Sequence, residues 1–266
     1  MATALLLGTP FFIFFGWLSD RIGRKFIILG GCALAAATYF PAFHLLSVAA
    51  NPALIAATES AAITVSADPR ECSFQFDPVG KNRFDTTSCD IAKSWLARAG
   101  VNYRNVAAPP GAVASISIGA LTLAAPDPAR ISGAERAGAI KAYGESIGKA
   151  LADAGYPAKA DPARIDRVAV VAVLFYLVLL VTMVYGPIAA MLVELFPSRI
   201  RYTSMSLPYH IGNGWFGGFL PTTAFAMVAA TGNIYYGLWY PVVVAALTVV
   251  VGLIFLPETF RRRIDQ

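Results

Sequence analysis

Residues 16–25 read Gly-Trp-Leu-Ser-Asp-Arg-Ile-Gly-Arg-Lys, and this stretch decides the interpretation of the chain. It joins two uncharged apolar runs, Met1–Leu18 and Phe26–Leu46. An acid at the exit of an apolar segment, followed by a short basic loop with a glycine, is typical of a tight turn at a membrane surface. Asp20 could face the N-terminal dipole of the next helix and pair with Arg24. For an isolated basic loop, a generic cytoplasmic turn would be the simpler explanation.

Further uncharged apolar segments follow along the chain. A membrane-spanning helix needs about 20 apolar residues, because each residue rises about 1.5 Å through roughly 30 Å of hydrocarbon. Mean hydropathy is +0.60 and charged residues make up only 14% of the chain, which argues against an ordinary soluble domain at about 25%. The sequence therefore predicts an α-helical membrane protein with five spans, at Met1–Leu18, Phe26–Leu46, Val168–Val193, Leu207–Ala230 and Tyr235–Leu256.

Charged residues are concentrated in one part of the chain. Residues 51–166 hold 12 acids and 12 bases, whereas the other 150 positions share four acids and nine bases. The net charge of +5 thus belongs to the membrane part, which argues against nucleic acid as a partner. We expect three parts: spans with a signature loop at 1–46, a polar insert at 47–166, and spans with a cytoplasmic tail at 167–266.

The basic residues of the short loops predict the orientation. Lys and Arg remain on the cytoplasmic side of a membrane. Threading five spans puts all three basic clusters on one face: Arg21, Arg24 and Lys25; Arg199 and Arg201; and Arg261, Arg262 and Arg263. We therefore expect a multi-pass protein of the bacterial inner membrane, with a periplasmic insert and a cytoplasmic C-terminus.

The insert has the pattern of a small α+β domain. Strands are indicated at Ile63–Val65, at Cys72–Phe76, where Cys72, Phe74 and Phe76 would point inward, and at Ile116–Ile118. Thr87–Ala99 predicts a helix that ends at Gly100. Ser132 and Glu135 form a capping-box pattern before a second helix with an apolar stripe. The insert contains no pattern for a metal site, a phosphate loop or a catalytic nucleophile, so no cofactor is expected.

Cys72 and Cys89 both lie in the insert, where the predicted location outside the cytoplasm favours a disulfide. Closing a loop of about 15 residues would contribute roughly 3 kcal/mol. Two unrelated buried thiols are the alternative. Cys32 lies inside a span and is most simply a small buried apolar residue.

The stretch at 16–25 resembles the G-x-L-x-D-R-x-G-R-K signature of the major facilitator superfamily. Residues 185–218 resemble the tenth and eleventh helices of its metabolite:proton symporter branch, whose members carry citrate, oxoglutarate, shikimate, proline or betaine. Leu256–Thr259 resembles the P-E-T sequence that closes the twelfth helix of sugar-porter-like members. The resemblance covers about 1–46 and 168–260, and the signature positions are Gly16, Asp20, Arg21, Gly23 and Arg24.

This resemblance implies a partial major facilitator fold made of helices eight to twelve. The chain would be part of a proton-coupled secondary transporter for a small organic solute, a carboxylate or a betaine- or proline-like compound. Its partners would be the solute, a proton, the lipid bilayer and the missing N-terminal half. A truncated reading frame and a split gene both remain open, and the fragment alone should not transport. The alternative is a membrane-anchored extracytoplasmic binding or interaction module.

The resemblance also implies a charged gate at the cytoplasmic ends of the helices, formed by Asp20, Arg24, Glu194 and Arg201. His210 and Asn213 are the most polar side chains of the glycine-rich span. They are candidates for contact with substrate or proton, because polar groups inside membranes are often functional. A hydrogen-bonded structural role for His210 is the alternative. His44 and His210 both lie in predicted spans, so an enzyme is the least supported class and no catalytic residue is predicted.

Overall fold

The computed structural model describes residues 1–261 and divides into two compact units. The helical unit comprises Met1–Ala49, Asp166–Leu220 and the chain from Leu238 onward. The sheet unit comprises Ala50–Ile165 and Pro221–Gly237. Two arginines of the last predicted basic cluster, Arg262 and Arg263, lie outside the described residues.

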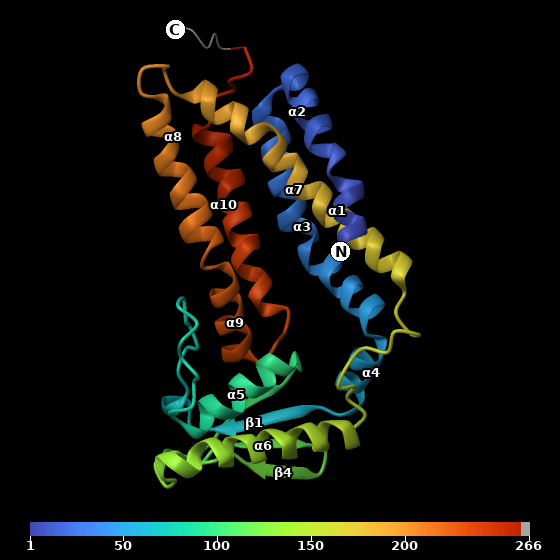
Figure 1. Cartoon of the computed structure of the whole chain (residues 1–266), viewed down its shortest axis with the longest axis vertical. Helices are drawn as coiled ribbons and strands as arrows, with labels where there is room; N and C mark the ends of the chain where they lie inside the picture. The colour runs from blue at the N-terminus through green and yellow to red at the C-terminus, as the bar shows by residue number, and fades with distance from the viewer. Residues whose placement is uncertain (262–266) are drawn as a thin grey trace. The chain divides into compact units, whose positions relative to one another are not determined.

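The helical unit consists of long helices joined by short turns (Figure 1). Four helices in the described part of the chain are long and apolar enough to cross a membrane: Ala2–Ile22, Arg24–Ala50, Arg167–Leu195 and Tyr236–Phe255. Each contains most of one predicted span. The first is divided at Thr9 by Pro10. The elements are α1 (Ala2–Gly8), α2 (Pro10–Ile22), α3 (Arg24–Ala50), α7 (Arg167–Leu195), α8 (Arg201–His210), the π-helical segment η2 (Ile211–Gly217) and α10 (Trp239–Phe255).

The remaining predicted span, Leu207–Ala230, is not one continuous α-helix. The chain runs from α8 through η2, a short turn and α9 (Leu220–Thr231). The π-helical turns come at a run rich in glycine, which favours irregular backbone over a regular helix. A fifth span therefore remains a prediction.

Helices α2 and α7 approach each other closely at a pair of glycines. A Cβ atom on Gly186 would lie 3.0 Å from the carbonyl oxygen of Phe12 and 3.2 Å from the backbone nitrogen of Gly16. Similar crowding occurs at Gly31, where a Cβ would lie 2.9 Å from that of Met183 on α7. Small residues of this kind let helices pack backbone to backbone in a membrane.

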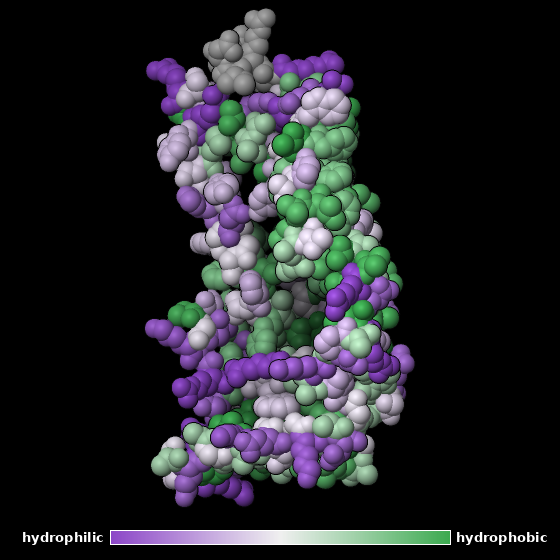
Figure 2. Space-filling view, turned by 45° about the vertical axis from the view of Figure 1, so that its right-hand side comes forward, coloured by the Kyte–Doolittle hydropathy of each residue, from purple (hydrophilic) through white to green (hydrophobic). Residues whose placement is uncertain are grey.

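The helical unit exposes much apolar surface. Figure 2 shows green, hydrophobic side chains over much of this unit and purple side chains at the end near the C-terminus. Among its exposed side chains, Leu6 is 76% exposed, Ile13 78% and Phe255 76%. A surface this apolar fits contact with lipid or with another protein rather than with water.

The sheet unit contains a four-stranded sheet in the order β2-β1-β3-β4. β1 pairs in parallel with β2 and antiparallel with β3, and β3 pairs antiparallel with β4. Besides most of α9, the described elements are α4 (Pro52–Ser60), β1 (Ile63–Ala67), η1 (Pro69–Glu71), α5 (Ser88–Ala99), β2 (Arg104–Ala107), β3 (Ser115–Ile118), β4 (Leu121–Ala124), α6 (Gly133–Asp153) and the start of η3 (Tyr236–Leu238).

Its core forms where the sheet meets α5 and α6. Val65 and Ile116 of the central strands are buried together with Leu96 of α5 and Ile147 of α6. These strands and helices agree with the periodicity of the sequence. The expected end of α5 is also present, because Gly100 adopts a left-handed conformation with φ of 68°. Cys89, at the start of α5, is joined to Cys72 by a disulfide.

One strand prediction in the insert is wrong. Cys72–Phe76 forms no strand, and the expected inward and outward positions are reversed at Phe74 and Gln75. Phe74 is 58% exposed while Gln75 is 1% exposed, because Gln75 Nε2 donates to the carbonyl oxygen of Asp90 at 3.0 Å. Specific polar bonds to α5 therefore override the alternating pattern.

The predicted capping box at the start of α6 also differs from expectation. Ser132 is the N-cap, as expected, but its Oγ donates to Glu135 Oε2 at 2.8 Å instead of accepting from a backbone N–H. The backbone N–H of Glu135 donates to the carbonyl oxygen of Ser132. The predicted pair of residues is therefore correct, but their hydrogen bond joins two side chains, and the side chain of Ser132 does not accept from the helix backbone.

The two connections to the insert lie side by side. The backbone N–H of Asp166 donates to the carbonyl oxygen of Ala49 at 3.0 Å. Farther along the same helices, the hydroxyls of Thr38 on α3 and Tyr176 on α7 are 2.8 Å apart. Since neighbouring helices α3 and α7 carry the two ends, a long insertion can be accommodated here without separating them.

Candidate functional site: a buried arginine network

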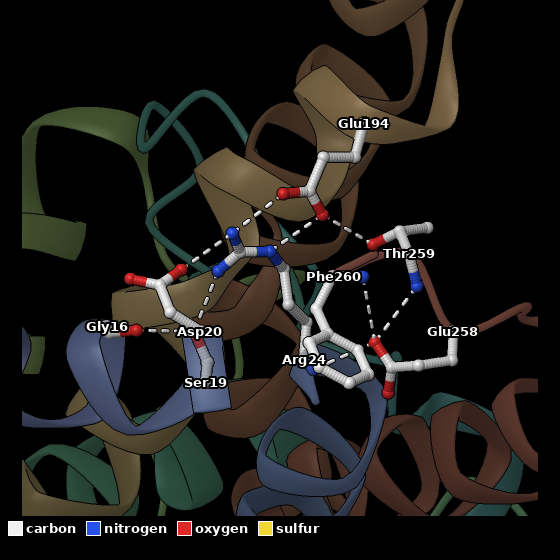
Figure 3. A network of polar contacts seen from close by, with 8 residues as sticks. All are labelled: Gly16, Ser19, Asp20, Arg24, Glu194, Glu258, Thr259 and Phe260. Atoms are coloured by element: carbon white, nitrogen blue, oxygen red, sulfur yellow. Dashed lines mark hydrogen bonds and ion pairs between the residues drawn. The ribbon is translucent and has the colours of Figure 1, made fainter. Parts of the chain in front are cut away.

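Arg24 lies at the first position of α3 and is almost completely buried, with 7% exposure. Its guanidinium makes two bonds to Glu194 at the end of α7, from Nε to Oε2 and from Nη2 to Oε1, both at 2.7 Å (Figure 3). Nη2 is also 2.8 Å from Oδ1 of Asp20 on α2, the expected ion pair. The fork geometry of arginine suits this two-point contact with a carboxylate.

The two acids that pair with Arg24 differ in exposure. The side chain of Glu194 is 7% exposed and that of Asp20 is 60% exposed. An exposed pair contributes little, usually under about 1 kcal/mol. Removing one partner of a buried pair costs about 3–5 kcal/mol because it leaves an uncompensated charge. Most of the energetic consequence of losing Arg24 therefore lies in its bond to Glu194.

The chain after α10 completes the site with two residues that sequence reasoning did not assign to it. Glu258 accepts hydrogen bonds from the backbone N–H groups of Arg24 at 2.9 Å and Lys25 at 3.1 Å. Glu258, rather than Asp20, is thus the acid at the N-terminal dipole of α3. Thr259 is fully buried, and its Oγ1 donates to Glu194 Oε2 at 2.7 Å. Both belong to the P-E-T sequence directly after the last span, a signal that could have indicated them.

Ser19 of α2 also contacts Arg24. Nη1 of Arg24 donates to Ser19 Oγ at 2.8 Å, and that hydroxyl donates to the carbonyl oxygen of Gly16 at 2.6 Å. Ser19 is fully buried and was not predicted. We refer to Ser19, Asp20, Arg24, Glu194, Glu258 and Thr259 as the Arg24 network.

Gly23 makes the approach of Glu258 possible. Its φ of 109° lies in the left-handed region, which side chains with a Cβ rarely adopt. A Cβ there would also lie 2.5 Å from Glu258 Oε2. The signature glycines Gly16 and Gly23 therefore both mark close approaches of backbone to a neighbour.

The other two arginines predicted for this region have separate contacts. Arg201 begins α8, and its Nε donates to the carbonyl oxygen of Phe196, just beyond α7, at 3.2 Å. The guanidinium carbon of Arg21 lies 4.0 Å from the centroid of the Trp17 ring and is exposed at the surface. Both are on chain segments next to the Arg24 network.

His210 and Asn213 lie where α8 passes into η2. The hydroxyl of Tyr185 on α7 donates to Asn213 Oδ1 at 3.1 Å, and Asn213 Nδ2 donates to the carbonyl oxygen of Tyr209 at 3.2 Å. The rings of His210 and Tyr209 are 5.9 Å apart. This polar group is exposed in the structure. Among residues 1–261 no cluster of three or more acids, histidines and cysteines could hold a metal ion.

Part of the chain matches a known family of proteins. Residues 146–266 match the family described as "Sugar (and other) transporter". This match supports the resemblance to a transporter family over these residues. The matched residues include α7 to α10, and Glu194 of α7 is bonded to Arg24 in the stretch at 16–25.

A curated relative supports the same assignment. The chain is 41% identical over 83 residues to a Haemophilus influenzae protein named "Putative metabolite transport protein". The similar stretch covers 30% of this chain and 17% of the relative, so the chain spans only a small part of the length of that protein. No solved structure matches.

Proposed function

We propose that this chain is part of a proton-coupled secondary transporter for a small organic solute, and that the Arg24 network is its cytoplasmic gate. The supporting observation is that one buried guanidinium links α2, α3 and α7, while Thr259 after α10 bonds to the same glutamate. The match of residues 146–266 to a transporter family supports the general class. Two finer parts of the proposal rest on the resemblance of residues 185–218 to the symporter branch. These are the solute, a carboxylate or a betaine- or proline-like compound, and the coupling to protons.

The gate would act by holding helix ends together in one state of the transport cycle. Secondary transporters rock two halves about a central solute site. Opening the cytoplasmic side would separate Arg24 from Glu194, and the cost of exposing or unpairing these charges sets the balance between states. In this proposal Asp20 adjusts that balance, since its carboxylate is exposed and its bond to Arg24 is the weaker one.

Asn213 and His210 are the proposed contacts for the solute or proton. Asn213 lies in a π-helical segment, a geometry that often marks functional sites in helices. Tyr185 of α7 fixes the amide orientation of Asn213 through its hydroxyl. Polar side chains in membrane segments are expensive to bury and are therefore functional candidates.

A complete transporter would also require a second set of helices. We propose that a separate or missing N-terminal half packs against the exposed apolar surface of the helical unit. The chain alone is then expected to insert into a membrane without transporting. Coding sequence directly upstream of this chain, with seven further spans, would support this arrangement.

The proposal is tested by uptake into membrane vesicles with an imposed pH gradient. The chain is produced alone and together with the upstream coding sequence, and labelled citrate, shikimate, proline and betaine are offered. Uptake that needs both products and collapses with a protonophore supports the proposal. Asp20→Asn should lower this uptake at unchanged expression, whereas Arg98→Gln, in the insert, should not. Normal uptake by Asp20→Asn would reduce the role of Asp20 to a topology signal.

Orientation in the bacterial inner membrane forms a separate part of the proposal, with the insert periplasmic and the C-terminus cytoplasmic. Single cysteines are placed at Thr231, Lys159 and Ser198 in a chain without native cysteines. An impermeant thiol reagent added to intact cells should label the first two positions and spare Ser198. Labelling of Ser198 alone would reverse the orientation.

The second candidate is a membrane-anchored extracytoplasmic binding or interaction module. It is favoured by the sheet unit, which has its own buried core. This candidate predicts an unrelated upstream sequence with its own start and no solute uptake in any combination. The same vesicle experiment therefore separates the two candidates.

A further inference from the structure

The carboxyl end of α9 is bound by side chains from the insert. Helices leave their last carbonyl groups without partners inside the helix. Here the hydroxyl of Tyr103 donates to the carbonyl oxygen of Ala229. Nδ2 of Asn105 lies 3.1 Å from the carbonyl oxygens of both Ala230 and Thr231. The insert thus supplies the cap of a helix that begins more than a hundred residues later in the sequence.

The turn after α9 is bound by the same segment. The backbone N–H of Tyr103 donates to the carbonyl oxygen of Gly232 at 2.8 Å, and that of Ile234 donates to Asn102 Oδ1 at 2.9 Å. Gly232 has φ of 81°, and the space a Cβ would occupy is filled by Tyr103. A glycine is therefore required for this contact on both conformational and steric grounds.

A second arm of the insert contacts the first turn of α9. The backbone N–H of Asp77 donates to Thr222 Oγ1 at 2.9 Å. This arm is anchored on α5 near its other end by the disulfide at Cys72. Ser73 adds two bonds of 2.8 Å to the buried carboxylate of Asp90, from its backbone N–H and from its hydroxyl. The insert therefore contacts α9 at both ends.

Tyr103 is suited to a permanent contact. It is 6% exposed, and burial raises its pKa, so the phenol remains a neutral hydrogen-bond donor. Without its partner, the hydroxyl would be a buried unpaired group, which is unfavourable. The chain enters the sheet unit at Pro221, shortly after η2, so the regular helix is already interrupted where this contact begins.

We propose that Asp77, Asn102, Tyr103 and Asn105 form a clasp that fastens α9 and the following turn to the insert. In this proposal α9 moves together with the insert, and η2 is the joint that permits this movement. The insert is then a mechanical element that controls the position of α9, beyond any role of the Arg24 network. The clasp does not depend on the solute or on proton coupling.

The test measures hydrogen–deuterium exchange in the purified full chain in detergent micelles, comparing wild type with Tyr103→Phe. Loss of one hydrogen bond worth about 1 kcal/mol should speed exchange in peptides covering 226–236 by about fivefold. The matched control is Tyr143→Phe, because Tyr143 is a buried tyrosine of the same unit whose hydroxyl has no partner among the described residues. That variant should leave 226–236 unchanged.

Asn105→Ala provides a second variant, because Asn105 is exposed and its loss should not disturb the core. It should also speed exchange at 226–236 while peptides of α7 remain at the wild-type rate. Unchanged exchange at 226–236 in both variants, with β1 still protected, would overturn the clasp. Faster exchange of 226–236 in Tyr143→Phe to the same extent would also overturn it, since the effect would then be general loosening of the insert.

Discussion

The two units of this chain are stabilised in different ways. The sheet unit closes a hydrophobic core around β1, β3, α5 and α6 and adds a disulfide. The helical unit brings backbones together at glycines and joins helix ends through a buried ion pair, while large apolar side chains face outward. The first arrangement suits a domain in water, where burial of apolar surface drives folding. The second suits a bilayer, where that drive is absent and packing and polar bonds dominate.

The two units differ in how strongly their stability depends on individual residues. Residues in the core of the sheet unit share its stability among many contacts. In the helical unit, a few polar atoms at one end connect α2, α3, α7 and the segment after α10. A single substitution at Arg24 or Glu194 should therefore remove several connections between helices at once.

The strongest test of this difference is Arg24→Gln. It leaves Glu194 buried without its cation, which should destabilise the helical unit by about 3–5 kcal/mol. The full chain is denatured in mixed detergent micelles, and hydrogen–deuterium exchange in peptides of α3 and α7 measures the change in stability. Arg21→Gln is the control, because its exposed stacking on Trp17 is worth only about 0.5–1 kcal/mol. Equal effects of the two variants would contradict a special role for the network.

Removing the disulfide tests the sheet unit in the same way. The double variant Cys72→Ser/Cys89→Ser should lower the stability of this unit by roughly 3 kcal/mol in the chain-entropy model. A preliminary experiment establishes that the bond forms in membranes. Free thiols are alkylated without any reduction, the protein is then digested, and the peptides are analysed by mass spectrometry. Recovery of both cysteines in alkylated form would contradict the bond and weaken the placement of the insert outside the cytoplasm. Cys32→Ser, in α3, is the comparison variant.

Two glycines sharpen the contrast in packing. Gly186→Ala forces a methyl group against the backbone of α2, and overpacking of this kind costs about 1–3 kcal/mol. Gly148→Ala on α6 meets open space and should stabilise the sheet unit by about 1 kcal/mol, because alanine favours a helix. Denaturation curves of the two variants should therefore shift in opposite directions. A stabilising Gly186→Ala would show that α2 and α7 are less tightly packed than the structure indicates.

Much of the fold follows from sequence because its signals are local. Uncharged apolar runs locate the four long helices, and residue periodicity locates β1, β3, α5 and α6. Cys72–Phe76 fails because partners distant in sequence, on α5, determine which side chains turn inward. Leu207–Ala230 is apolar enough for a span, but hydropathy does not register the backbone freedom of its glycines, and η2 interrupts the α-helix.

The site shows the same division. Asp20 and Arg24 are four residues apart on adjacent helix ends, and the resemblance supplied Glu194. Glu258 and Thr259 were missed because their partners are far away in sequence, and only the fold brings them to the N-terminus of α3. The clasp on α9 was missed for the same reason, since Tyr103 and Asn105 bond to backbone atoms that carry no sequence signature.

The smallest expected effect concerns Asp68, a carboxylate that contrasts with Glu194. Glu194 is held by a guanidinium, whereas Asp68 accepts backbone N–H bonds from Arg70 at 3.0 Å and Gly111 at 2.9 Å. These bonds lower the pKa of Asp68 below its ordinary value. The ionised carboxylate therefore contributes to the stability of the sheet unit at pH values above the ordinary pKa. This contribution is lost as the pH falls through the lowered pKa. Asp68→Asn should therefore be less stable than wild type at neutral pH, and the difference should shrink below about pH 4. Hydrogen exchange of β1 peptides across this pH range measures the difference, with a substitution of the exposed Glu59 of α4, Glu59→Gln, as the control. A difference that stays constant with pH would show that the amide geometry matters and the charge of Asp68 does not.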